Sequence, residues 1–315
     1  MVHVLIIDNK SNKSRFQNVR AENFRRMLRE EGIESEVLYK TSVSALIKSI
    51  LNLRPKVICL LNGDPISDTI VLVISKLFDI KAIYDLRTLT PGQRNPLLRK
   101  AYLFLYKLNV HLSDKTFSPI LKLSKLWDIE LMPQAVKEQK KTFTKNFIIY
   151  CGSFRKMEGP DILIKAFKMI KNKKVQLILI GKGPLQRKLF DLAKSDKRIK
   201  ILGYRDHEEC LKWIREALLC VVPMRRTYAS DFDSIYSVLK LADYLSANKP
   251  IVCADVGDLN KAKGYGVLLF EPGNIIDLCR KIEKQLKNPI RTRVPKEILY
   301  EEVKKKFLRV IHEFL

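Results

Sequence analysis

The chain has 315 residues, of which 46% are hydrophobic and 30% are charged. This composition excludes a disordered chain, and the length suits two domains better than a single core. The net charge of +25 indicates a polyanionic partner, such as nucleic acid, an anionic membrane surface or a phosphorylated substrate. A thermophile-like surface, rich in Lys and Glu, explains the same charge without any partner.

Six cysteines and four histidines are scattered along the chain. No two cysteines have C-x-x-C spacing, and most lie in or beside apolar runs, so we expect buried, reduced thiols in a cytoplasmic protein. The isolated histidines predict no metal site. The N-terminus has no basic signal segment, and no apolar run approaches the ~18 residues of a membrane span.

In the first half, apolar runs alternate with amphipathic stretches. We expect strands at 2–8, 35–39, 56–61, 82–85, 115–118 and 129–132, and helices at about 19–31, 43–53, 66–78 and 96–112. Short, nearly continuous Val, Ile and Leu runs separated by helices predict a doubly wound parallel sheet.

The second half repeats this alternation. We expect strands at 147–151, 175–180, 199–202, 219–222, 251–254 and 267–270, and helices at about 160–171, 184–194, 207–217, 237–246 and 274–287. The predicted fold class is therefore α/β, with two Rossmann-like domains facing a cleft. Their predicted bounds are 1–137 and 146–290, with a charged linker at 138–145 and a final helix in 291–315 that packs back towards the first domain.

The most informative stretch is S-V-L-K-L-A-D-Y-L-S-A-N-K-P-I-V-C-A-D-V at 237–256. We expect a helix that starts at Ser237 and leads through a Lys-Pro turn into an apolar strand. The N–H groups and the dipole of a helix N-terminus attract an anion. Asp243 lies six residues into this helix, where its carboxylate is placed to accept hydrogens from two hydroxyls of a sugar or ribose.

This stretch resembles the sugar-nucleotide site of GT-B glycosyltransferases of the family 4 type, whose pattern is roughly S-P-x-K-x-x-E-Y-x-A-x-G-K-P-V-V. Four further blocks match the family in order and spacing. They are G-S-F-R-K-M-E-G-P-D-I-L-I-K-A-F at 152–167, L-I-L-I-G-K-G-P at 177–184, I-L-G-Y at 201–204 and V-L-L-F-E-P-G-N at 267–274. The resemblance covers about residues 146–290 and implies the GT-B fold.

The resemblance implies that the second domain binds a nucleotide-sugar donor. Its candidate donor-binding residues are Gly152, Ser153, Arg155, Lys156, Gly181, Tyr204, Arg205, Arg225, Arg226, Ser237, Val238, Lys240 and Asp243. The sequence departs from the family at three charged positions, because Ser153, Glu158 and Ile235 stand where Arg, Lys and an acidic residue are expected. Four basic residues are either replacements for the lost charge or solvated surface: Arg155, Lys156, Arg225 and Arg226.

In the first domain, the resemblance implies an acceptor site. Asn9, Lys10 and Arg15 lie in a polar, basic loop that suits a phosphorylated or sugar acceptor, or is simply surface. Asp85 and Arg87 end another strand, near where the family often has a histidine or acidic group, and they are the candidate catalytic residues. The basic, aromatic stretch 95–107 is either a contact with an anionic membrane or a helix with one core face.

The sequence as a whole predicts an enzyme that moves a sugar from a nucleotide-sugar to a glycan, lipid-phosphate or small-molecule acceptor. The resemblance implies retention of configuration, with no metal and no cofactor. We expect a cytoplasmic protein, or one bound peripherally to the inner face of the membrane. Two alternatives remain: an inactive relative that binds a glycan or a partner enzyme, and a sugar-nucleotide 2-epimerase. No recognition motif accompanies the charge, which argues against nucleic acid.

Overall fold

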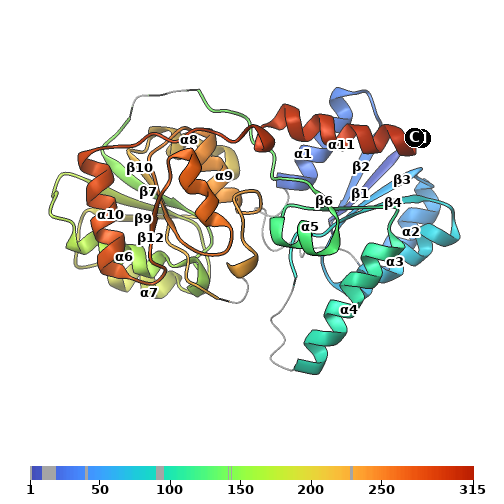
Figure 1. Cartoon of the computed structure of the whole chain (residues 1–315), viewed down its shortest axis with the longest axis horizontal. Coiled ribbons are helices and arrows are strands. Elements are labelled where there is room, and N and C mark those ends of the chain that lie inside the picture. Colours follow the sequence, from blue (N-terminus) through green and yellow to red (C-terminus); the bar gives the residue numbers. More distant parts are fainter. Residues whose placement is uncertain are drawn as a thin grey trace. The chain divides into compact units, whose positions relative to one another are not determined.

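The computed structural model describes residues 2–8, 19–39, 42–89, 96–140, 142, 144–227 and 230–315. The chain divides into two compact units, Met1–Ala135 with Tyr300–Leu315, and Val136–Leu299. Each unit contains a six-stranded parallel sheet flanked by helices (Figure 1). The predicted α/β fold with two doubly wound parallel sheets is therefore confirmed.

The sheet of the first unit has the strand order β2-β1-β3-β4-β5-β6. Its strands are β1 (Val4–Asp8), β2 (Ser35–Tyr39), β3 (Val57–Leu61), β4 (Lys81–Asp85), β5 (Lys115–Ser118) and β6 (Glu130–Leu131). Its helices are α1 (Val19–Glu30), α2 (Val43–Leu53), α3 (Pro65–Leu77), α4 (Pro96–Leu112), α5 (Leu121–Trp127) and α11 (Tyr300–Phe314). Crossovers between parallel strands are right-handed. From β1 to β2 the chain moves towards one edge of the sheet, and from β2 onwards it moves towards the other edge. Helix α1 therefore lies on one face of the sheet, and α2 to α5 lie on the other.

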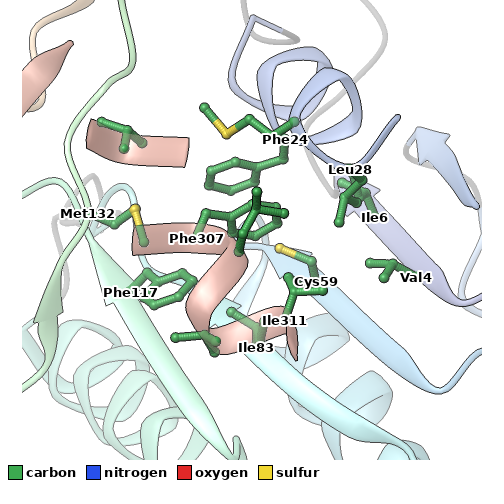
Figure 2. Close-up of a cluster of buried hydrophobic side chains, with 14 of the residues drawn as sticks. Val4, Ile6, Phe24, Leu28, Cys59, Ile83, Phe117, Met132, Phe307 and Ile311 are labelled. Atoms are coloured by element: carbon green, nitrogen blue, oxygen red, sulfur yellow. The ribbon is translucent and has the colours of Figure 1, made fainter. Parts of the chain in front are cut away.

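The core of the first unit is completed by the far end of the chain (Figure 2). The ring of Phe307, in α11, stacks on that of Phe24, in α1, with centroids 4.2 Å apart. The rings of Phe307 and Phe117, in β5, also pack edge to face, with centroids 6.5 Å apart. These contacts bury α11 against α1 and the sheet, so residues 300–315 belong to the first unit.

The sheet of the second unit has the strand order β12-β11-β10-β7-β8-β9. Its strands are β7 (Phe147–Cys151), β8 (Gln176–Ile180), β9 (Ile199–Gly203), β10 (Leu219–Val222), β11 (Ile251–Ala254) and β12 (Leu268–Phe270). Its α-helices are α6 (Pro160–Met169), α7 (Gln186–Ala193), α8 (His207–Glu216), α9 (Leu239–Ser246) and α10 (Ile275–Lys287). Short 3-10 helices are η2 (Lys156–Glu158), η3 (Ser230–Phe232), η4 (Leu259–Tyr265) and η5 (Lys296–Ile298).

Two of the differences from the sequence predictions concern segments that lead into or through the second unit. The helix expected to start at Ser237 begins at Leu239, because Ser234 and Ser237 form a turn in which the Ser234 N–H donates to Ser237 Oγ at 2.8 Å. The segment predicted as a linker is hydrogen-bonded to the second unit. Its Gln139 N–H donates to the carbonyl of Ser246 at 2.8 Å, and the Lys145 N–H to that of Glu216 at 2.7 Å.

All six cysteines are buried and none is in a disulfide. Within the described residues, no helix combines the length and apolar character needed to cross a membrane.

Candidate functional site

The candidate site lies at the carboxyl ends of β7 and β10. Here the chain changes direction across the sheet, because β7 continues to β8 on one side and β10 continues to β11 on the other. Such a switch point is where ligands bind in open α/β sheets. The loop after β7 carries Ser153 and Glu158, and the loop after β10 leads to Lys240 in α9.

Glycines bring these loops together. Gly159 has φ +69°, and a Cβ there would lie 1.8 Å from the carbonyl oxygen of Pro223. The Arg225 N–H donates to the carbonyl of Met157 at 2.9 Å, which joins the same two loops. A Cβ on Gly181, which follows β8, would likewise lie 1.8 Å from the carbonyl oxygen of Gly152. A side chain at Gly181 would therefore push the loop after β7 away from β8, whereas one at Gly152 would meet the ends of the Tyr150 and Lys240 side chains. The donor-binding roles suggested for both glycines stay predictions.

Lys240 is the central cation of the site. Its ammonium forms an ion pair with Glu158, the residue that stands where the family has a lysine. The Nζ also lies 5.0 Å from the centre of the Tyr150 ring, and a Cβ on Gly152 would lie 3.2 Å from it. The Tyr150 hydroxyl in turn donates to the Ser153 carbonyl at 2.7 Å. Lys240 therefore lies against the start of the loop after β7.

Asp233 adds a titratable group to this charge cluster. Burial and, to a smaller extent, the negative charge of Glu158 raise its pKa to about 7 against the opposing effect of Lys240. Its backbone is fixed, because the Asp258 N–H donates to its carbonyl at 2.8 Å. The net charge around Lys240 therefore changes near neutral pH.

The two candidate arginines after β10 have other partners. The guanidinium of Arg225 binds both carboxylate oxygens of Asp161, at 2.8 and 2.9 Å. Burial raises the pKa of Asp161, but Arg225 outweighs this effect and holds it below its usual range. Arg226 donates to the carbonyl of Asp255 at 3.0 Å. These partners of the two arginines therefore lie away from Lys240, and the predicted donor-binding roles of both arginines stay predictions. Arg155 and Lys156 are exposed beside η2.

Asp243 is 5% exposed, and its carboxylate faces His207. The Nε2 atom of His207 lies 3.1 and 3.0 Å from the two carboxylate oxygens. Burial alone lowers the pKa of His207, but the hydrogen bond and charge of Asp243 outweigh it, so the pKa is raised above its ordinary value. His207 therefore has an ionisable partner in the folded chain. Sequence offered no signal for this pair, because the two residues lie in different helices, α8 and α9, and are 36 positions apart.

Tyr204 and Arg205 follow β9 and are half-buried. The Lys182 ammonium lies 4.5 Å from the centre of the Tyr204 ring, and Arg205 Nε is 2.8 Å from the Glu209 carboxylate. The Ser237 hydroxyl bonds within its own turn, and Val238 is the N-cap residue of α9. The ligand roles suggested for these four residues stay predictions.

In the first unit, Asp85 is fully buried rather than open to a substrate. Arg20 binds both of its oxygens, with Nε 2.7 Å from Oδ2 and Nη2 2.8 Å from Oδ1. Arg20 also donates to the carbonyls of Met132 and Pro133. This bidentate pair joins α1 to β4, and Arg20 is the partner that sequence reasoning missed.

Arg87 is held at the same edge of the first sheet. Its Nη2 lies 2.9 Å from Asp8 Oδ1, and its backbone N–H donates to Asn62 Oδ1 at 2.7 Å. The catalytic roles of Asp85 and Arg87 stay predictions. Asn9, Lys10 and Arg15 lie outside the described residues. In the part of the chain that the structure covers, no three His, Cys, Asp or Glu residues are grouped so as to hold a metal ion.

The architecture that results, two doubly wound domains, is shared with GT-B proteins of known structure. The chain aligns with Anabaena Alr3699/HepE in complex with UDP and glucose at a TM-score of 0.76, with 11% identity, over 99% of this chain and 100% of that one. It aligns with UDP-GlcNAc 2-epimerase from Neisseria meningitidis at a TM-score of 0.64 and 12% identity, over 99% and 100%. At these identities the likeness establishes the fold alone.

Sequence comparison finds a family that resembles the second unit. Residues 145–288 match the model of glycosyl transferases group 1. A 147-residue stretch is 31% identical to an uncharacterized glycosyltransferase of Methanocaldococcus jannaschii and covers 45% of this chain. This stretch spans 39% of that relative's length. The chain thus has the GT-B fold, and residues 145–288 of its second unit are similar to the glycosyl transferases group 1 family.

Proposed function

We propose that the chain is a glycosyltransferase whose second unit binds a nucleotide-sugar donor. The observation that carries this proposal is the position of Lys240. It lies at the switch point of the second sheet, against the loop after β7, within the segment that matches the family. A cation beside the start of a helix at this edge suits a diphosphate.

The roles proposed for the residues of this site follow from the negative charge that develops on the leaving diphosphate. As the bond between the sugar and the diphosphate breaks, negative charge grows on the leaving phosphate. Lys240 and the N-terminus of α9 would stabilise that charge. Lys240 must first exchange Glu158 for phosphate, and protonation of Asp233 at about pH 7 would lessen the repulsion of an incoming anion. Asp243 would accept hydrogens from the ribose hydroxyls after the ring of His207 moves aside.

We further propose that the first unit binds the acceptor, a glycan or a lipid phosphate, and that the reaction retains configuration. The acceptor hydroxyl forms the new bond to the sugar, and its proton passes to the leaving phosphate. Lys240 and the α9 N-terminus would supply the countercharge, so we propose that no metal or cofactor takes part. Transfer in the presence and absence of EDTA tests this point.

The base of the donor is proposed from the structural neighbours. Anabaena Alr3699/HepE has crystal structures in complex with UDP and glucose and with UDP-glucose, and we propose a uridine nucleotide for this chain too. Calorimetric titration with UDP, GDP and ADP, and with the corresponding sugar nucleotides, tests the choice.

Two alanine variants decide whether the proposed residues bind the nucleotide. We expect Lys240→Ala to weaken UDP binding roughly 10- to 100-fold, the range of a lost charged hydrogen bond. Asp243→Ala should weaken it by a similar factor. Lys194→Ala is the matched control, since this exposed lysine pairs only with a neighbouring aspartate in α7. The proposal is wrong if no nucleotide binds, or if both variants bind as the unaltered chain does.

One observation favours a second candidate, a binding protein without transfer activity. Glu158 neutralises the lysine that would act on the diphosphate. Release of free sugar from a bound donor separates the two, because an inactive relative would bind the nucleotide-sugar and leave it intact. A 2-epimerase would instead return an altered sugar nucleotide.

A further inference from the structure

The outer surface of the first unit has a concentration of exposed apolar side chains. Among the described residues, fourteen large apolar side chains are exposed, and eight of them lie between residues 51 and 104. They are Leu51, Ile66, Val73, Leu77, Phe78, Leu97, Leu98 and Phe104. All eight belong to α2, α3, α4 or the residue that ends α3. These helices cover one face of the sheet, and α3 packs against both neighbours.

Helix α3 turns one apolar stripe away from the protein. Ile66, Val73 and Leu77 are spaced at i, i+7 and i+11, which places them on a single helix face. The opposite face, which includes Val71 and Leu72, is buried against the sheet. Leu77 is 75% exposed. An outward stripe of this kind is not needed for the core of the first unit.

Helix α4 adds a second stripe with cations beside it. Leu97 and Phe104, seven residues apart, are 75% and 65% exposed. Lys100 and Lys107 have the same spacing, and both are exposed on the adjoining line of the helix. The other side of α4 is anchored to α3, because Asn109 donates to the Pro65 carbonyl at 3.1 Å and accepts from Thr69 at 2.7 Å. In Figure 1, α4 runs out beyond the rest of its unit.

We propose that the stripes of α3 and α4, called here the α3–α4 face, dock the first unit on an anionic membrane surface. Apolar side chains would enter the interface, and the lysines would meet lipid phosphates. Neither α2 nor α4 contains an acidic residue. A second copy of the chain would bring like charges together, and its net charge is +25, so an anionic bilayer is the complementary partner. Helix α4 lies on the membrane rather than crossing it.

Co-sedimentation with lipid vesicles tests the proposal. The vesicles are phosphatidylglycerol with phosphatidylcholine, and phosphatidylcholine alone. We expect binding to the anionic vesicles only. Leu97→Asp with Phe104→Asp should reduce the bound fraction at least 10-fold, and Val73→Asp with Leu77→Asp should do the same from α3. Lys100→Gln with Lys107→Gln should reduce the preference for anionic lipid.

The matched control replaces exposed apolar side chains of the second unit. Met169→Asp with Phe190→Asp changes two residues that are 49% and 45% exposed and lie among lysines of α6 and α7. This variant should bind vesicles as the unaltered chain does. Equal binding by all variants, or equal loss in the control, overturns the proposal. So does a dimer in sedimentation velocity that the α3 or α4 variants dissociate, since the α3–α4 face would then join two copies.

The proposal does not depend on the nucleotide site. UDP binding is measured on the same variants and should stay unchanged. Loss of vesicle binding with intact UDP binding supports the docking surface, whereas failure of UDP binding in every sample contradicts the proposed function alone. Circular dichroism establishes that each variant is folded. The changed positions are exposed, so their replacement removes no core contact.

Discussion

At the scale of single residues, the second unit holds two ionisable pairs that sequence alone would not have joined. Glu158 and Lys240 are 82 positions apart, and His207 and Asp243 are 36 apart. Lys240 and Asp243 are candidate donor-binding residues, whereas Glu158 departs from the family pattern and His207 lies outside its matched blocks. The chemistry of the site therefore depends on the partner as much as on the expected residue.

The His207–Asp243 pair predicts a pH-dependent stability. The pKa of His207 is raised in the folded state, so protonated His207 stabilises the fold fully below its unfolded pKa, and this contribution is lost as pH rises through the folded pKa. We expect His207→Gln to lower the free energy of unfolding by on the order of 1 kcal/mol near pH 6 and by less at pH 8. Urea unfolding at both pH values measures the difference. His312→Gln, an exposed position of α11, should show no such change with pH.

The Glu158–Lys240 pair predicts a gain in nucleotide affinity on mutation, provided that the proposed function holds. Glu158→Gln frees Lys240 and removes a negative charge, so UDP should bind roughly 3- to 10-fold more tightly, about 1 kcal/mol. Loss of that charge also lowers the pKa of Asp233 from about 7. Calorimetry at pH 6 and pH 8 measures both effects. Weaker binding by Glu158→Gln would show that Glu158 supports the ligand instead of competing with it.

At the scale of elements, the loops after β7 and β10 lie in contact because a glycine, Gly159, permits their close approach. Gly159 and Gly203 have similar φ values, +69° and +73°, but different surroundings. A Cβ on Gly159 would lie 1.8 Å from a backbone oxygen, whereas a Cβ on Gly203 would meet nothing within 4 Å. The pair separates the cost of a clash from the cost of left-handed backbone.

We therefore expect unequal effects from two identical substitutions. Gly203→Ala should lower the free energy of unfolding by about 1 kcal/mol, the cost of the backbone conformation alone. Gly159→Ala should cost more than about 2 kcal/mol, because the loop must also move away from Pro223. Urea unfolding of the two variants measures the difference, and equal losses would mean that the two loops separate at little cost.

At the scale of the whole molecule, the chain returns to its first unit to complete the core. The stacked ring of Phe307 is fully buried between α1 and the sheet. Phe307→Ala should destabilise the first unit by about 3–5 kcal/mol through lost burial and the cavity that remains. Thermal unfolding followed by calorimetry should show the first unit's transition at a lower temperature. The second unit's transition should be unmoved, and His312→Ala in the same helix should change neither.

Much of the fold is predictable from local pattern. Val, Ile and Leu runs marked central strands such as β1, β3 and β7, because strands buried on both faces must be largely apolar. The start of α9 was misplaced by two residues, since the Ser234–Ser237 turn competes with the first helical turn. Arg20 was missed for a different reason. A buried arginine in an amphipathic helix has the same sequence signal as an exposed one. Its partner Asp85 is 65 positions away along the chain, so only the folded structure reveals the pair.

The sequence by itself determined the class of fold, the order of the elements and the segment that matches a glycosyltransferase family, because these depend on periodicity and on short blocks of adjacent residues. The tertiary structure decided which charges meet. Lys240 faces Glu158, Asp243 faces His207, and Asp85 is enclosed by Arg20. Ion pairs form across loops and between helices, where distance along the chain carries no information, so their partners follow from packing rather than from pattern.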